Sequence, residues 1–204
     1  MTIESDISVY YSEKVSKYGA CPRGVDWNGV ESQMIRFNQL SKLISANSDF
    51  SVNDLGCGYG AFLGYLNSNF ESFHYFGLDI SCEMIEKAKD IYGDKLNAEF
   101  YCISKPPQVA NYSIASGIFN VKLGYSDSDW LNHIKQTLRV LYDSSSEGFA
   151  FNCLTKYSDR ERMQNKLFYG DPSFFFDWCK NNFSRNVALL HDYDLYEFTI
   201  IVRK

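Results

Sequence analysis

From residue 50 onward the sequence alternates short apolar runs with helical patterns, and this alternation constrains the fold more than any other feature. Runs with the character of strands are SVNDL, FHYFGLDI, AEFYCI, YSIASGIFNV and GFAFNCL. Helical patterns follow as AFLGYLNSNF, CEMIEKAKDIYG and SDWLNHIKQTLRVLYD, the last with Ser126 or Ser128 near its start. Such alternation predicts an α/β fold, a mostly parallel sheet with helices on both faces. Two final apolar runs around Asp192 and Asp194 predict an antiparallel hairpin that closes the sheet.

Helices are also expected outside this alternation. Apolar spacing predicts helical segments over residues 7–18, 32–44, 158–168 and 173–182. Between the first two lies YGACPRGVDWNGV, which is rich in Gly and Pro and predicts an irregular segment. The first part of the chain is therefore expected to fold over the open edge of the sheet.

Length and charge limit the class of protein. A chain of 204 residues fits one domain, 1–204, in which residues 1–48 form a helical cover and residues 49–204 form the core. The net charge of −5 disfavours a protein whose main task is to bind the nucleic-acid backbone. No stretch reaches the about 18 apolar residues of a membrane span, and the start of the chain does not resemble a signal peptide. We expect a cytoplasmic protein without a membrane partner.

Cysteine and histidine spacings argue against metal binding. Six cysteines include no C-x-x-C pair, so reduced and mostly buried thiols are expected. The three histidines stand in no metal-ligand spacing, and we expect no metal site. His74 is interpreted as a strand-start residue and His133 as a helix-surface residue.

A glycine-rich loop follows the first predicted strand in D-L-G-C-G-Y-G. Glycines at 56, 58 and 60 are typical of a tight turn with positive φ, and also of a backbone that a ligand approaches closely. Asp79 ends the second predicted strand about twenty residues later, where a carboxylate can bind a ribose diol. It is alternatively the N-cap of the next helix, although Ser81 is the better cap candidate. The loop also satisfies a relaxed dinucleotide fingerprint, so NAD is a competing ligand.

Together, VNDLGCGYG, FGLD and YSIASGIFN resemble the class I S-adenosylmethionine-dependent methyltransferases, from about residue 50 to the end. GVDW, SGIFN, FNCLT and HDYDLYEFT are similar to a bacterial small-molecule subgroup of these enzymes, but they name no substrate. The resemblance implies a Rossmann-like seven-stranded sheet that binds S-adenosylmethionine and releases S-adenosylhomocysteine. It implies that the ribose is bound by Asp79. The other cofactor contacts that it implies are Asp54, Gly56, Cys57, Gly58, Gly60, Ile80, Met84 and Ser116.

One position departs from the family pattern. Many members carry an acidic residue after the third strand to meet the adenine amino group, but here the strand runs AEFYCISKPP. Ile103 and Ser104 are assigned to adenine, with Ser104 or a backbone carbonyl in place of the acid. The run Lys105-Pro106-Pro107 resembles part of the D/N-P-P-Y motif of enzymes that methylate the amino groups of adenine bases or glutamine. It follows the third strand here, however, and the fourth strand ends in SGIFN without that motif. Methylation of nucleic-acid bases through this chemistry is therefore disfavoured.

Candidate substrate residues follow the later strands or precede the sheet. Methyl transfer is an in-line displacement, so the protein mainly aligns the reactants and a general base is optional. Asn120 and His191 are the candidate catalytic residues, and the candidate substrate contacts are Tyr11, Arg23, Trp27, Phe119 and Asn152. Alternatives remain: the two asparagines as loop or cap hydrogen bonds, Arg23 as a partner of Asp26, and His191 as a turn residue.

The sequence thus predicts methyl transfer from S-adenosylmethionine to an oxygen or nitrogen of a small polar molecule, by a monomer or homodimer. One alternative is a methyltransferase that acts on protein or RNA. Another is a sensor that binds S-adenosylmethionine or a nucleotide without turnover.

Overall fold

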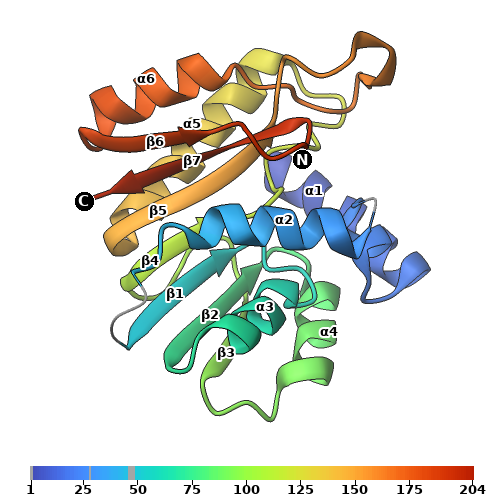
Figure 1. The fold of residues 1–204 in the computed structure, drawn as a ribbon. Helices are drawn as coiled ribbons and strands as arrows, with labels where there is room; N and C mark the ends of the chain where they lie inside the picture. Colours follow the sequence, from blue (N-terminus) through green and yellow to red (C-terminus); the bar gives the residue numbers. More distant parts are fainter. Residues whose placement is uncertain (1, 28, 46–48) are drawn as a thin grey trace.

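A seven-stranded sheet forms the centre of the computed structural model, which describes residues 2–27, 29–45 and 49–204 (Figure 1). The strand order is β3-β2-β1-β4-β5-β7-β6, so the order reverses between β1 and β4. Strand β7 runs antiparallel to both of its neighbours, β5 and β6, and the other pairs of adjacent strands are parallel. The strands are β1 (Phe50–Leu55), β2 (Phe73–Asp79), β3 (Ala98–Cys102), β4 (Ala110–Ala115), β5 (Ser145–Leu154), β6 (Asn186–Leu190) and β7 (Glu197–Arg203). The predicted sheet and closing hairpin are confirmed.

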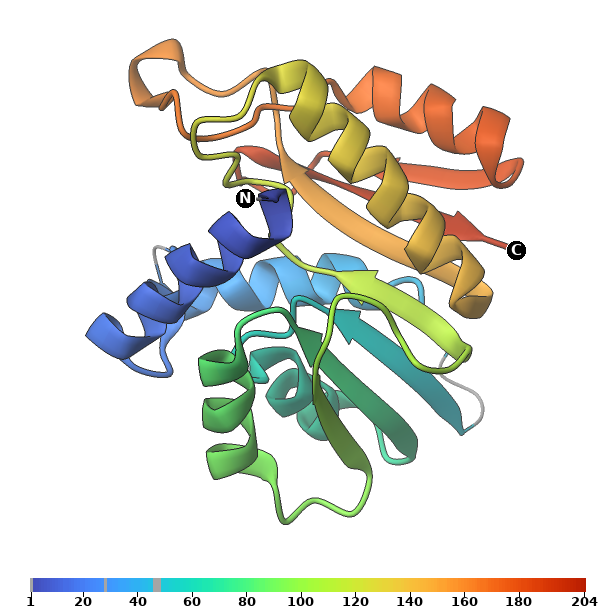
Figure 2. The same cartoon turned by 180° about the vertical axis from the view of Figure 1, so that it is seen from behind.

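Helices cover both faces of this sheet and build one apolar core on each (Figures 1 and 2). One core packs α2 (Val30–Ser41), α3 (Ala61–Asn69) and α4 (Cys82–Tyr92) against the strands. The other packs α1 (Ile3–Tyr18), α5 (Asp127–Asp143) and α6 (Pro172–Asn182). Two short 3-10 helices complete the elements, η1 (Pro22–Val25) and η2 (Arg160–Arg162). Helix α1 crosses the edge of the sheet where the parallel strands end (Figure 2).

Local side chains explain where several helices begin. The Ser81 hydroxyl accepts a hydrogen bond from the backbone N–H of Met84, so Ser81 caps α4. Ser126 caps α5 in the same way. Thr2 caps α1 and exchanges hydrogen bonds with Ser5, which starts this helix before the expected residue 7.

The structure differs from the sequence prediction on both sides of β5. No helix covers residues 158–168 except η2, because the end of this segment pairs with the chain that follows β4. The N–H groups of Lys122 and Leu123 donate to the carbonyl of Lys166, and the N–H of Phe168 donates to that of Asn120. The strand predicted over YSIASGIFNV is shorter than expected. Strand β4 stops at Ala115, and Gly117 then adopts a φ of +77°.

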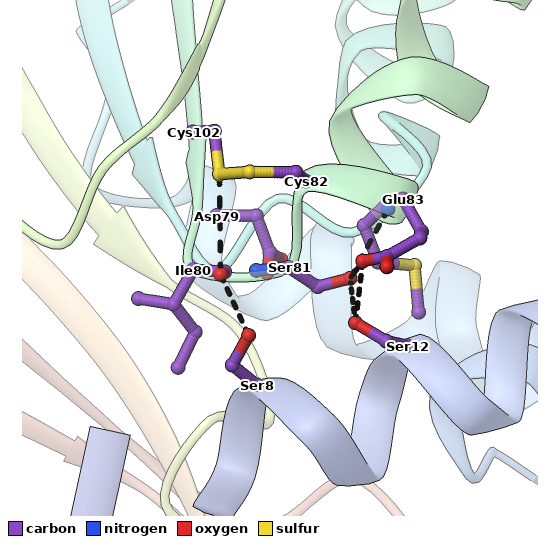
Figure 3. Close-up of a disulfide and its surroundings, with 9 residues drawn as sticks. Ser8, Ser12, Asp79, Ile80, Ser81, Cys82, Glu83 and Cys102 are labelled. Carbon is purple, nitrogen blue, oxygen red and sulfur yellow. Dashed lines mark hydrogen bonds between the residues drawn. A yellow bond between two sulfur atoms is a disulfide. The ribbon is translucent and has the colours of Figure 1, made fainter. Parts of the chain in front are cut away.

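A disulfide between Cys82 and Cys102 corrects the expectation that all the cysteines are reduced (Figure 3). Parallel pairing sets Cys102 opposite Asp79, and Cys82 opens the helix that follows β2. Both cysteines are exposed. Sequence spacing alone does not reveal the bond because its partners meet only when β3 docks beside β2. The free cysteines are Cys21, Cys57, Cys153 and Cys179.

Two expected absences concern the described part of the chain. No helix there is both long and apolar enough to cross a membrane. Among the same residues no group of three or more His, Cys, Asp or Glu side chains could hold a metal ion.

Candidate functional site

A pocket lies at the carboxyl ends of β1, β2 and β4, under the cover that α1 and η1 form. It sits where the strand order reverses, which is where open α/β sheets bind ligands. The predicted residues that line it are Tyr11, Trp27, Asp54, Gly56, Cys57, Gly58, Asp79, Ile80, Met84, Ile103, Ser104 and Ser116. Most of the predicted site is therefore brought together in one cavity.

The glycine loop serves both as a tight turn and as a wall of the pocket. Gly56 and Gly58 have φ values of +75° and +55°. A Cβ on Gly56 would lie 2.2 Å from the side chain of Ile118, and one on Gly58 would lie 3.2 Å from Val25. Gly60 also has positive φ but belongs to the start of α3, outside the pocket lining. The loop is thus both a tight turn with positive φ and a stretch of backbone that a ligand can approach closely.

Asp79 joins the glycine loop to the start of α4. Its carboxylate accepts hydrogen bonds from the N–H groups of Gly58 and Ser81, both at 2.9 Å. Burial raises the pKa of Asp79, while these backbone donors act in the opposite direction. Because Ser81 caps α4, Asp79 does not serve as that cap. The carboxylate is held rigidly, with acceptor capacity left for a ligand hydroxyl.

Asp54 lies deeper in the same pocket and is only 2% exposed. The hydroxyl of Tyr75 donates to its carboxylate at 2.6 Å. Burial raises the pKa of Asp54 to about 7, and the nearby Asp79 adds to this effect. Two carboxyl groups thus share one poorly solvated site, which favours a ligand that brings positive charge or hydrogen-bond donors.

The cover is bonded to the rim of the pocket. On α1, Ser8 donates to the carbonyl of Ile80 at 2.8 Å and Ser12 to the carboxylate of Glu83 at 2.6 Å (Figure 3). Next to η1, Asp26 accepts hydrogen bonds from Tyr10 and Lys14. These bonds hold the irregular segment between α1 and α2 over the site.

Arg23 does not pair with Asp26, which was the alternative to a substrate role. It lines a second cavity with Lys14, Tyr18, Asp26 and Trp27. Trp27 lines both cavities and therefore lies between them. Arg23 therefore stands beside the main pocket, not in its wall.

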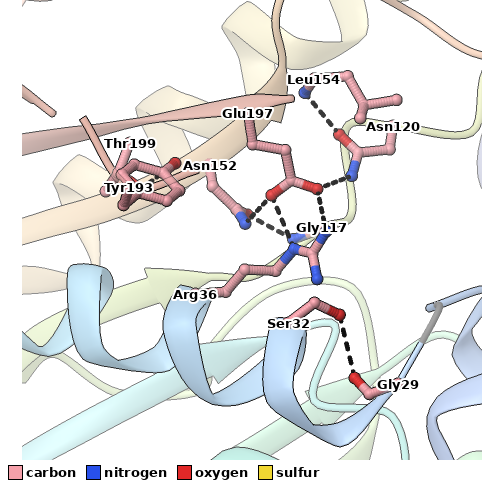
Figure 4. Close-up of polar contacts among 10 residues, drawn as sticks. All are labelled: Gly29, Ser32, Arg36, Gly117, Asn120, Asn152, Leu154, Tyr193, Glu197 and Thr199. Carbon is pink, nitrogen blue, oxygen red and sulfur yellow. Dashed lines mark hydrogen bonds and ion pairs between the residues drawn. The ribbon is translucent and has the colours of Figure 1, made fainter. Parts of the chain in front are cut away.

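A buried polar network lies behind Gly117, which is its one member in the pocket lining (Figure 4). Glu197 accepts two hydrogen bonds from Arg36, at 2.7 and 2.8 Å. Asn152 donates to Glu197 at 2.8 Å, and its side-chain oxygen accepts the N–H of Gly117 at 2.6 Å. Asn120 donates to Glu197 at 3.5 Å and accepts from Leu154 at 3.0 Å.

The structure places four of the predicted site residues outside the pocket lining. Asn120 and Asn152 are not in the pocket lining, because their amides are occupied in holding the turn after β4. Phe119 is 1% exposed and packs in the core, with its carbonyl accepting the indole N–H of Trp130. His191 is exposed at the end of β6 and lies outside the pocket, with its ring centroid 6.0 Å from that of Tyr157. A direct contact of these four side chains with substrate has no support in this geometry.

Sequence reasoning missed two groups of residues. Arg36 and Glu197 stand 161 positions apart, and no local pattern links them. The guanidinium of Arg36 also stacks on Trp27, 4.6 Å from the ring centroid. The other missed residues line the pocket and come from helices: Glu4, Ile7, Gln33, Phe37, Ala61, Phe62, Trp130, His133 and Thr137. Helical periodicity could have placed Phe37 on the inner face of α2, but not beside the pocket.

Comparison with known proteins identifies the family. A family model described as a methyltransferase domain matches residues 52–143. A Mycobacterium tuberculosis (strain ATCC 25618 / H37Rv) protein named "Putative methyltransferase Rv1506c" is 50% identical over 163 residues, which cover 80% of this chain and 98% of that protein. The chain belongs to the class I S-adenosylmethionine-dependent methyltransferases.

Solved structures show the same fold for this methyltransferase. The structure described as the DhpI-SAM-HEP complex has a TM-score of 0.69 and 15% identity, over 99% of this chain and 98% of that one. The N-methyltransferase NodS from Bradyrhizobium japonicum WM9, in complex with S-adenosylhomocysteine, has a TM-score of 0.66 and 10% identity, over 100% and 99% of the two chains.

The pocket of this methyltransferase fits its cofactor on structural grounds. The rigid carboxylate of Asp79 suits a ribose diol, and the glycine loop leaves no side chain at 56 and 58 to obstruct a ligand. The hydroxyl of Ser116, which lines the pocket, is buried without a hydrogen-bond partner among the described residues. Such a group is expected to meet a ligand, because burying it unpaired costs free energy.

Proposed function

We propose that this methyltransferase transfers a methyl group from S-adenosylmethionine to an oxygen or nitrogen of a small polar molecule. The observation that carries the proposal is a single pocket that runs from Asp79 and Ile80 to Trp27, beneath a cover bonded to its rim. A covered pocket favours a small acceptor over a long polymer. The cofactor supplies a methyl group on a positively charged sulfur, and the protein must bring the acceptor into line with it.

The acceptor end of the pocket is assigned to Tyr11, Trp27, Gln33 and Phe37. They combine flat apolar surface with an amide that can orient a polar group. Burial raises the pKa of Tyr11, so its hydroxyl stays protonated and acts as a hydrogen-bonding group, not as a base. Since His191 lies elsewhere, the proposed transfer relies on alignment and exclusion of water. The carboxyl groups of Asp54 and Asp79 favour the positively charged cofactor over NAD.

Calorimetric titration tests the cofactor assignment first. Wild type, Asp79→Ala and Asp90→Ala are titrated with S-adenosylmethionine, S-adenosylhomocysteine and NAD. Asp90 is the matched control, because it is an exposed aspartate on α4. We expect wild type and Asp90→Ala to bind the first two ligands alone. Asp79→Ala should bind them about a hundredfold more weakly, since two hydrogen bonds to a charged group are lost.

Acceptor class is tested by release of S-adenosylhomocysteine. Small amines and alcohols, an unfolded protein mixture and total RNA are supplied in separate assays. Turnover with a small acceptor alone supports the proposal. Turnover with protein or RNA alone would contradict it, and cofactor binding without any turnover would favour the sensor. Binding of NAD alone would overturn the cofactor assignment itself.

A further inference from the structure

One end of the pocket is built by helices on the face of the sheet opposite α2. Glu4 of α1 and His133 and Thr137 of α5 line it together with Ile103 and Ser104. The connection between β3 and β4, residues 103–109, contains no helix. Helices α1 and α5 therefore line the pocket beside this short connection.

Bonds along α1 place this wall next to the residue that follows Asp79. Ser8 donates to the carbonyl of Ile80 at 2.8 Å. Glu4 precedes Ser8 by one helical turn, so the two side chains lie on the same face of α1. Glu4 is also close enough to His133 to influence its titration. Asp79, Ile80 and His133 thus line one pocket, so a base that extends past Ile80 from a ribose bound to Asp79 points toward the part of the lining that α1 and α5 supply.

His133 has the chemistry that an adenine edge requires. Its ring lies 5.1 Å from that of Trp130, and no hydrogen bond to the ring exists within the described part of the chain. Burial lowers the pKa of His133, although Glu4 opposes this, and a neutral imidazole offers one donor and one acceptor nitrogen. Thr137 donates its hydroxyl proton to the carbonyl of His133 at 3.0 Å, which leaves the threonine oxygen as an acceptor.

The sequence leaves a role open at this point. No acidic residue follows β3 to accept a hydrogen bond from the adenine amino group, and Ser104 alone stands there. We propose that His133 of α5 binds the amino edge of the cofactor's adenine and so replaces the missing acid after β3. The inference rests on the proposed function, because it assumes that the pocket holds S-adenosylmethionine. It assigns specificity for the base to a helix, not to the strand end.

Two ligands that differ only at this edge test the inference. S-inosylhomocysteine carries a carbonyl oxygen where S-adenosylhomocysteine carries the amino group, so it cannot donate there. Calorimetry with wild type should show S-adenosylhomocysteine bound about tenfold more tightly, the effect of one hydrogen bond. In His133→Phe the two affinities should become nearly equal, because the ring stays but the acceptor is lost. In His133→Gln, which keeps an acceptor oxygen, part of the preference should remain.

Matched variants separate the possible outcomes. His74→Phe alters an exposed histidine on β2 that bonds Glu99, and it should keep the wild-type preference. Ser104→Ala should keep it as well. An unchanged preference in His133→Phe, or its loss in Ser104→Ala alone, would overturn the inference. Failure of wild type to bind S-adenosylhomocysteine at all would instead contradict the proposed function.

Discussion

At the scale of single residues, the site depends on how Asp79 is held. Its two oxygens accept from a loop glycine and from the cap residue of α4, so the loop and the helix share one carboxylate. A tight turn at Gly56 makes this possible, because the N–H groups of Gly56 and Cys57 both donate to the carbonyl of Leu78. Position 56 must stay glycine, since a Cβ there would overlap Ile118. The chemistry of one carboxylate therefore depends on backbone geometry across two strands.

Asp54 should make stability depend on pH. Its pKa is about 7 in the fold against an ordinary 3.8, so the folded chain holds this proton more tightly than the unfolded chain. The resulting stabilisation is complete below the unfolded pKa and is lost as pH rises through about 7. Asp54→Asn cannot ionise and keeps an oxygen for the Tyr75 hydroxyl. We therefore expect the free energy of unfolding of Asp54→Asn, relative to that of wild type, to rise by at least about 1 kcal/mol between about pH 4 and about pH 8.

Urea unfolding without ligand, repeated across this range, measures the difference. Asp79 titrates in the same direction and is present in both proteins, so the difference reports the ionisation of Asp54 together with its coupling to Asp79. Asp90→Asn, at an exposed position, is the control and should follow wild type. Parallel stability curves for wild type and Asp54→Asn would show that burial does not raise this pKa.

At the scale of elements, the Cys82–Cys102 disulfide links the end of β3 to the start of α4, next to Ile103 in the pocket lining. It closes a loop with a sequence separation of 20, and loops of this size imply about 3 kcal/mol in the chain-entropy model. We expect Cys82→Ser/Cys102→Ser to lower the free energy of unfolding, measured by urea titration, by about that amount. The cytoplasm predicted from the sequence is a reducing compartment, in which such bonds are rare. The disulfide is therefore at odds with the predicted cytoplasmic location.

A reducing agent provides the second arm of this test. It should destabilise wild type to the level of the double variant and leave the variant unchanged. Cys21→Ser removes a free, partly exposed thiol and is the matched control. If reduction has no effect on wild type, the bond does not contribute to stability.

At the scale of the whole molecule, α1 should respond to the cofactor more than any distant helix. Glu4, Ile7 and Tyr11 line the pocket from α1, while no residue of α6 lines it. S-adenosylhomocysteine at 100 times its dissociation constant should raise the free energy of unfolding by about 2.7 kcal/mol. Hydrogen exchange should slow in α1 beyond this global effect, because ligand contacts suppress local opening of the cover. Equal slowing in α1 and α6 would contradict the role of α1 as a cover.

Much of the fold followed from local patterns. The order of apolar runs, the cap at Ser81 and the hairpin around Asp192 and Asp194 were predicted, and Ser126 was one of two candidate caps. These features could be predicted from the sequence because each depends on residues within a few positions of one another. The expected helix over residues 158–168 failed for the complementary reason. Its backbone partners come from residues 120–123, which no local pattern reveals.

The sequence by itself determined the sheet, the glycine turn and the pair Asp54 and Asp79, because strand periodicity and loop chemistry are short-range properties. Tertiary structure alone decided the walls around them. It brought Arg36 to Glu197, Cys82 to Cys102 and His133 into the lining of the pocket, and it left His191 outside that lining. These outcomes depend on how helices dock on the two faces of the sheet. Docking is set by packing between segments far apart in the chain, which no single stretch of sequence records.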